Sequence, residues 1–144
     1  MSNTHFAVAV HALTLLAYAQ GSVLSSAEMA ASINTNPVFL QRILRMLQVG
    51  ELIETQRGVN GGSLLLRSPE SISLYDVYQA VQNGESALKI HEMPNPRCEV
   101  GGNIQTVLEG VIDEVDNALK NTLSHISLAD MYQGIKDCVS EAKS

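Results

Sequence analysis

The sequence has 144 residues, a formal net charge of −6, 45% apolar and 17% charged residues. This balance excludes a disordered chain, and the length suits one domain or a small domain with an attached interaction element. Two cysteines cannot supply a disulfide framework, no signal peptide opens the chain, and no apolar run reaches the roughly 20 residues that cross a bilayer. We therefore expect a cytoplasmic protein with no membrane partner.

The first predicted helix spans residues 4–20 and is apolar on almost every side. Alanine and leucine dominate it, and Gly21 follows, where a left-handed residue commonly ends a helix. A helix that is apolar nearly all round lies at the centre of a core. We expect the later elements to pack around it.

A helix-turn-helix is predicted next. Ser25 and Glu28 have the spacing of a capping box, which begins a short helix over residues 26–32. Asn36 is a good N-cap residue and Pro37 suits the first helical position, so a second helix is expected over residues 37–49. Its apolar positions repeat at helical spacing and leave a polar, basic outer face. A short helix, a tight turn and such a second helix form the layout of a helix-turn-helix.

A β-hairpin should follow this unit. Residues 52–56 and 63–66 alternate toward a period of two, and the glycine-rich residues 57–62 between them tolerate positive φ angles. A hairpin directly after a helix-turn-helix is a wing. Gly50 is predicted to end the preceding helix as a left-handed glycine.

The C-terminal part should contain the dimerisation element. Residues 73–82 are expected to form a helix, and the prolines and glycines of residues 84–102 predict a linker. We predict a DNA-binding domain over residues 1–83, this linker, and a dimerisation part over residues 103–144. The long helix predicted at residues 103–122 has an apolar stripe, which either packs on its own domain or pairs with a second chain. The stripe comprises Ile104, Val107, Leu108, Val111, Ile112, Val115 and Leu119.

The last predicted element is a short helix that begins near Ser127, followed by residues 141–144, which we expect to fray.

The charges are unevenly distributed along the chain. Residues 1–80 hold four basic and five acidic side chains, and the remainder holds five and ten. The four early basic residues are all arginines, lie between positions 42 and 67, and suit phosphate and guanine contacts. Four arginines in such a stretch could also be a solvated face. The DNA-reading surface is nevertheless expected between Ser25 and Arg67.

Three segments resemble a known family. The run RGVNGG at residues 57–62, the segment LRSPE at 66–70 and the segment ISLYDV at 72–77 are similar to those of the IscR/NsrR/CymR family of bacterial regulators. The segment ISLAD at 126–130 and the frame of residues 39–53 also match. The resemblance covers roughly the whole chain and implies a mainly α fold: a winged helix-turn-helix with a β-hairpin wing and a long C-terminal dimerisation helix. It also implies homodimers that bind partly palindromic operators.

Twelve residues are candidates for contacting DNA. Gln41 could read adenine, Arg42 or Arg45 could hold guanine or phosphate, and Arg57 would reach phosphates or the minor groove. Ser25 and Ser26 either donate to phosphate or only cap their helix. The full set is Ser25, Ser26, Asn36, Pro37, Val38, Gln41, Arg42, Arg45, Arg57, Asn60, Gly61 and Gly62.

The chain departs from the family pattern in three places. Its first helix lacks basic residues, Ser63 stands where an aromatic residue is usual, and residues 89–102 hold Cys98 alone instead of three cysteines. An iron–sulfur cluster normally needs several thiolate ligands, so we expect no cluster and no metal site. Arg97 and Glu99 would shift the pKa of the Cys98 thiol in opposite directions, which leaves its reactivity open.

The leading hypothesis is a DNA-binding transcription regulator that represses by blocking a promoter, with an unknown effector. One alternative is a winged helix used for protein interaction, which the acidic total favours. Another is a redox sensor acting through Cys98, whereas Cys138 is expected to be packed. The histidines form no ligand cluster or triad, so we expect no enzyme.

Overall fold

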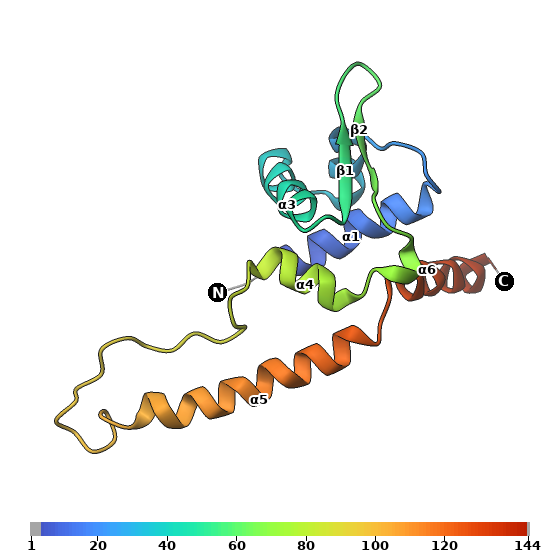
Figure 1. Cartoon of the computed structure of the whole chain (residues 1–144). Helices are drawn as coiled ribbons and strands as arrows, with labels where there is room; N and C mark the ends of the chain where they lie inside the picture. Colours follow the sequence, from blue (N-terminus) through green and yellow to red (C-terminus); the bar gives the residue numbers. More distant parts are fainter. Residues whose placement is uncertain (1–3, 144) are drawn as a thin grey trace.

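The computed structural model describes residues 4–143, within which six α-helices surround a small core and one hairpin projects from it (Figure 1). The predicted class, a mainly α winged helix-turn-helix, is confirmed. The elements in chain order are α1 (His5–Tyr18), α2 (Ser26–Ile33), α3 (Pro37–Val49), β1 (Ile53–Gln56), β2 (Gly62–Leu65), the 3-10 helix η1 (Pro69–Ser71), α4 (Leu74–Gln82), α5 (Ile104–Ser124) and α6 (Leu128–Lys143).

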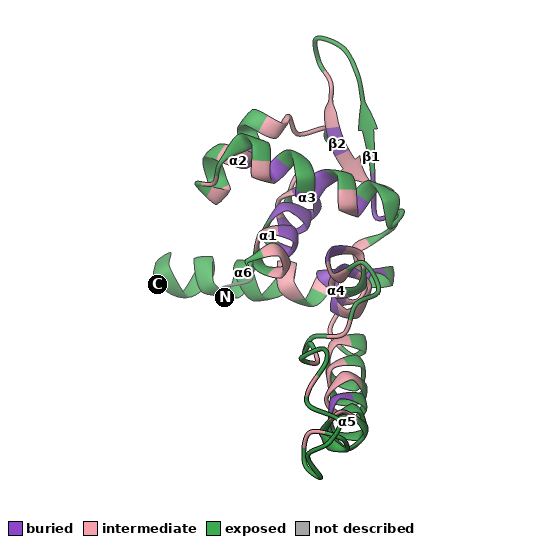
Figure 2. Ribbon diagram, turned by 90° about the vertical axis from the view of Figure 1, so that its left-hand side faces the viewer, coloured by how far each residue is buried: buried purple, intermediate pink, exposed green. Residues whose placement is uncertain are grey.

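The helix α1 lies at the centre of the core, as its sequence predicts (Figure 2). It contacts α2, α3, α4, α6 and β2, and small residues such as Ala9 and Ala12 let these elements approach closely. Leu13 is completely buried. The left-handed backbone after α1 begins at Gln20, one residue before the predicted Gly21.

The two helices of the helix-turn-helix begin at side-chain caps. The Ser25 hydroxyl accepts from the backbone N–H of Glu28 over 3.1 Å, and the Asn36 side-chain oxygen accepts from the N–H groups of Val38 and Phe39 over 2.7 and 3.3 Å. Each bond satisfies a donor that a helix start leaves unpaired. The bounds of α3 agree with the prediction, and α2 extends one residue further than predicted.

The end of α3 differs from its prediction. Gly50 has an ordinary φ of −75°, and the left-handed residue is Glu51 at +60°. Position 50 favours glycine for a different reason, because a Cβ there would lie only 3.0 Å from the Cβ of Ala80 in α4, a tight contact. The C-terminal end of α3 therefore lies close to α4.

The predicted hairpin is present and its base is anchored. β1 and β2 are antiparallel, with Ile53 opposite Leu65 and Gln56 opposite Gly62. Ser63 is buried and exchanges two backbone hydrogen bonds with Leu24, of 3.0 and 2.8 Å, in the segment that precedes α2. This link fixes the wing relative to the helix-turn-helix.

The two helices of the C-terminal segment lie differently relative to the core, and the assignment of residues 103–144 as a dimerisation part stays a prediction. Only α5 extends away from the core; α6 returns to pack on α1 (Figure 1). Leu128 is completely buried, and its N–H donates to the carbonyl of Ile72 over 2.8 Å, while Leu74 donates to Ile126 over 2.8 Å. These contacts bind the start of α6 to the segment between η1 and α4.

The last helix is longer than predicted. α6 has 16 residues and continues to Lys143, so the expected fraying at 141–143 is wrong; Ser144 lies outside the described residues. The contact with α1 uses only the start of α6, and residues 133–143 are all exposed. None of the helices within residues 4–143 combines the length and apolar character of a membrane span.

Candidate nucleic-acid interface

The outer side of α3 presents a stripe of four exposed residues: Val38, Arg42, Arg45 and Val49. We call this the α3 outer stripe. It lies opposite the buried face of α3, since the positions of Leu40, Ile43, Leu44 and Leu47 fix the other side of the helix in the core. Gln41 is exposed beside the stripe. Because Gln48 is exposed as well, the helix presents two guanidinium groups, two amides and the side chains of Val38 and Val49 to solvent.

The wing presents a third exposed basic residue near α3. Arg57 and Asn60 are exposed in the hairpin loop, and Val59 at its tip is fully exposed. A Cβ on Gly62 would overlap the carbonyl oxygen of Leu24, and one on Gly61 would overlap that of Gln56. Close backbone approach therefore requires glycine at both positions, within the wing at Gly61 and between the wing and the segment before α2 at Gly62.

The α3 outer stripe and the wing lie at the same end of the molecule. Figure 1 shows the hairpin projecting beside α3, at the end remote from α5. Within residues 4–143, Arg42, Arg45 and Arg57 have no carboxylate partner at salt-bridge distance. Their charges are therefore available to an anionic partner.

The fourth early arginine is used inside the protein. Arg67 lies 3.5 Å from the Asp76 carboxylate and donates to the carbonyl oxygen of Ser71. Asp76 also accepts from the backbone N–H of Ser73 in the capping box of α4. Arg67 therefore fixes the exit of the wing to the start of α4, a role that its sequence neighbours did not reveal.

Two of the predicted DNA-contact residues cap the N-termini of their own helices. The Ser25 hydroxyl contacts both the backbone and the carboxylate of Glu28, and Ser26 is half-buried. The Asn36 oxygen is occupied by its two cap bonds, and Pro37 is exposed at the first helical position. The structure thus gives Ser25 and Asn36 a structural role that is independent of DNA.

The long helix α5 leaves most of its apolar stripe in solvent. Ile104, Val107, Leu108 and Val111 are exposed, while Val115 and Leu119 are half-buried. Ile112 is buried within its own chain, near Leu88 and Ile90 of the linker. Our inclusion of Ile112 in a partner-facing stripe was wrong, because it lies at the edge of the stripe that faces the linker.

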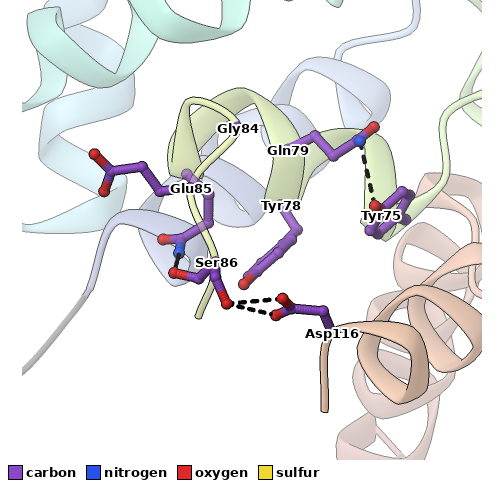
Figure 3. A pocket seen from close by; sticks show the side chains of 8 residues that line it. Tyr75, Tyr78, Gln79, Gly84, Glu85, Ser86 and Asp116 are labelled. Carbon is purple, nitrogen blue, oxygen red and sulfur yellow. Dashed lines mark hydrogen bonds between the residues drawn. The ribbon is translucent and has the colours of Figure 1, made fainter. Parts of the chain in front are cut away.

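A hydrogen-bonded latch joins the linker to α5. The Ser86 hydroxyl donates to the Asp116 carboxylate over 2.7 Å, beside a cavity of about 220 Å³ lined by Tyr75 and Tyr78 of α4 (Figure 3). Burial raises the pKa of the Tyr78 phenol, the neighbouring Gln82 side chain lowers it, and the nearby Asp116 carboxylate raises it. Sequence reasoning missed this latch because Ser86 and Asp116 are thirty residues apart.

Both cysteines are exposed. The N–H groups of Gly101 and Val100 lower the pKa of the Cys98 thiol by hydrogen bonding. The direction of this pKa shift is therefore set by the backbone, whereas we had considered the flanking charges of Arg97 and Glu99. Cys138 lies on α6 and is not packed, contrary to our expectation, since the contact with α1 uses the start of α6 around Leu128.

Comparison with known proteins identifies the family. The profile of the Rrf2 family, described as iron-dependent transcriptional regulators, matches residues 2–134. The chain belongs to the Rrf2 family. It is 40% identical over 131 residues to YwnA of Bacillus subtilis, named as an HTH-type transcriptional regulator, across 91% of this chain and 96% of the relative.

Solved structures resemble this Rrf2 protein in fold. A crystal structure described as that of a DNA-binding protein is 35% identical, covers 88% of this chain and 97% of its own, and has a TM-score of 0.71. IscR of T. potens, 24% identical over 96% of this chain and 90% of its own, has a TM-score of 0.69. The predicted function, DNA-binding transcription regulation, is confirmed at the level of the family.

The iron in the family description does not fit the donor set of this Rrf2 chain. Its two cysteines lie on different elements, Cys98 in the linker and Cys138 on α6. Within residues 4–143, no three histidine, cysteine, aspartate or glutamate side chains gather where they could hold a metal ion. A cluster bound by several thiolates therefore has no matching ligands within residues 4–143.

Proposed function

We propose that this Rrf2 protein is a homodimeric repressor, in which each protomer places α3 in the major groove and the wing against the adjacent backbone or minor groove. The observation that carries the proposal is the set of three unpaired arginines on the α3 outer stripe and the wing, at one end of a helix-turn-helix. The rest of the chain is acidic and would be repelled by phosphates, so DNA has one surface to approach.

The residue types on α3 support base reading as well as phosphate contact. Gln41 can accept from and donate to adenine, and Arg42 or Arg45 can donate twice to guanine. Each such pair discriminates by about 1–3 kcal/mol. Arg57 on the wing adds a phosphate or minor-groove contact, and Asn60 lies exposed beside it.

The exposed stripe of α5 supports dimerisation. A single chain leaves Ile104, Val107, Leu108 and Val111 partly in water, and pairing with the same face of a second α5 would bury all four at once. Such pairing is two-fold symmetric, and dimeric helix-turn-helix proteins bind half-sites that lie one or more helical turns of DNA apart. Because the protein symmetry is reflected in its binding site, the operator should be partly palindromic.

Retention on genomic DNA fragments tests the proposal. The logarithm of the binding constant should fall linearly with the logarithm of salt concentration, by about 0.9 for each phosphate contact. The recovered fragments should contain inverted repeats that overlap promoters, and the protein should lower transcription from them in a purified system. No retention at low salt would contradict DNA binding, and raised transcription would contradict repression alone.

We further propose that no iron–sulfur cluster resides in this chain, since Cys98 is the linker's lone cysteine. Protein purified without oxygen should lack cluster absorbance. Recovery of iron and acid-labile sulfide in stoichiometric amounts would contradict this.

A further inference from the structure

Val38 is an exposed apolar residue in the first turn of α3. Its side chain is 71% exposed on the α3 outer stripe, so the core gains little from it. Valine also forms helices less readily than alanine, leucine or the long polar residues. Neither burial nor helix propensity accounts for a valine at this position.

The orientation of Val38 is fixed by its neighbours. The Asn36 oxygen accepts from the Val38 N–H over 2.7 Å, and Pro37 holds the preceding φ angle at a helical value. Within a helix, valine occupies essentially one χ1 rotamer. The two methyl groups are therefore held in a set direction before any partner binds, which lowers the entropy cost of a contact.

The neighbours of Val38 on the helix surface are suited to base edges. Gln41 and Arg42 follow it by three and four residues and are exposed on adjacent positions. The major-groove edges of the bases offer donors, acceptors and one apolar group, the 5-methyl group of thymine. An amide, a guanidinium group and a fixed pair of methyl groups together match that set of features.

We propose that Val38 is a specificity-determining residue that packs against the 5-methyl group of a thymine in each operator half-site. The proposal rests on the proposed function, because it places the N-terminal end of α3 at the base edges. The thymine should adjoin the base pairs that Gln41 and Arg42 contact.

Val49 provides a matched control within the same stripe. It is 79% exposed at the other end of α3, eleven residues away, which is about 16 Å along the helix axis. In helix-turn-helix proteins the N-terminal residues of the second helix contact the base edges. Val49 should therefore have no thymine contact although it is the same residue type with similar exposure.

The experiment removes one methyl group from the DNA at a time. Operators selected from genomic fragments are synthesised with each thymine replaced in turn by deoxyuridine, and their Kd values are measured by fluorescence anisotropy at one salt concentration. At one thymine in each half-site, the loss of the methyl group should weaken binding about fourfold. Replacement at the other thymines should change Kd less than twofold.

Substitutions then assign the contact to a side chain. Val38→Ser should weaken binding to the unmodified operator and remove the difference between thymine and deoxyuridine. Val38→Thr, which keeps one methyl group, should retain part of that difference, and Val49→Ser should retain all of it. Circular dichroism should show the same helix content in all three variants, because both positions are exposed.

Three outcomes would overturn the proposal while leaving DNA binding intact: no deoxyuridine position that weakens binding, a selected half-site that lacks thymine, or a Val38→Ser variant that keeps the full deoxyuridine effect. Loss of the effect in Val49→Ser would also overturn it. If no genomic fragment is selected at all, the proposed function fails together with this inference.

Discussion

The helices α1 and α5 both have apolar sequences but are used differently. α1 has 14 residues, seven of them buried, whereas α5 has 21 residues, of which Ile112 alone is buried (Figure 2). The apolar residues of α1 cover most of its circumference and match a helix that packs against five other elements, while Ala7, His11 and Tyr18 stay exposed. Those of α5 form a stripe on one side, and four of its positions face solvent. A one-sided stripe on a projecting helix indicates a surface for a second chain.

This difference predicts two separable effects of substitution. Damage to α1 should destabilise each chain at any protein concentration. Damage to the stripe of α5 should act through association and therefore depend on concentration.

The largest effect is expected in α1. Leu13→Ala should lower the free energy of unfolding by about 3–5 kcal/mol, because it removes a completely buried side chain and leaves a cavity. Urea titration followed by circular dichroism measures the change. A loss below 1 kcal/mol would mean that α1 is not the centre of the core.

The next effect is expected in α5. Val107→Asp should weaken dimerisation by about 2–3 kcal/mol, on the order of 100-fold in Kd, since two carboxylates would face each other across the two-fold axis. Sedimentation should show monomers, and circular dichroism should show unchanged helix content. Val139→Asp, on an exposed apolar position of α6, is the matched control and should stay dimeric. Equal masses for the two variants would count against α5 as the interface.

A smaller effect is expected at the wing. Arg57→Ala should weaken DNA binding about 3- to 10-fold, with the dimer mass unchanged. It should also reduce by about one the slope of the logarithm of the binding constant against the logarithm of salt concentration. Arg67→Ala should instead lower stability and leave the slope as it was, because Arg67 is bound to Asp76 and Ser71. Identical salt slopes for the wild type and Arg57→Ala would show that the wing does not contact DNA through Arg57.

The smallest effect concerns the linker. The lowered pKa of Cys98 means that its thiolate persists to lower pH than that of an unperturbed cysteine with a pKa of 9.0. The rate of alkylation at Cys98 should therefore reach half its maximum at a pH below that value. Cys98→Ser should remove this reaction phase. A midpoint at or above the value of free cysteine would contradict the hydrogen bonds from Gly101 and Val100.

The sequence predicted features that depend on neighbouring residues. The cap at Asn36, the bounds of α3, the hairpin and the helix expected over residues 73–82 all follow from signals within a few positions. The family resemblance was equally local, since it depended on short runs such as residues 57–62.

Features that join distant residues could not be predicted. The return of α6 depends on Leu128 bonding to Ile72, more than fifty residues away, and the linker latch joins Ser86 to Asp116. The role of Arg67 and the burial of Ile112 depend in the same way on which elements lie side by side. Local patterns set the helices and their faces, but tertiary packing decides which faces meet.

The mass of the protein–DNA complex tests the account most directly. Light scattering on a selected operator, at a protein concentration above Kd, should give two chains per duplex, and Val107→Asp should lose most of its affinity for the same duplex while keeping its fold. One chain per duplex, or a Val107→Asp variant that binds as tightly as wild type, would contradict a regulator that reads its operator as a dimer paired through α5.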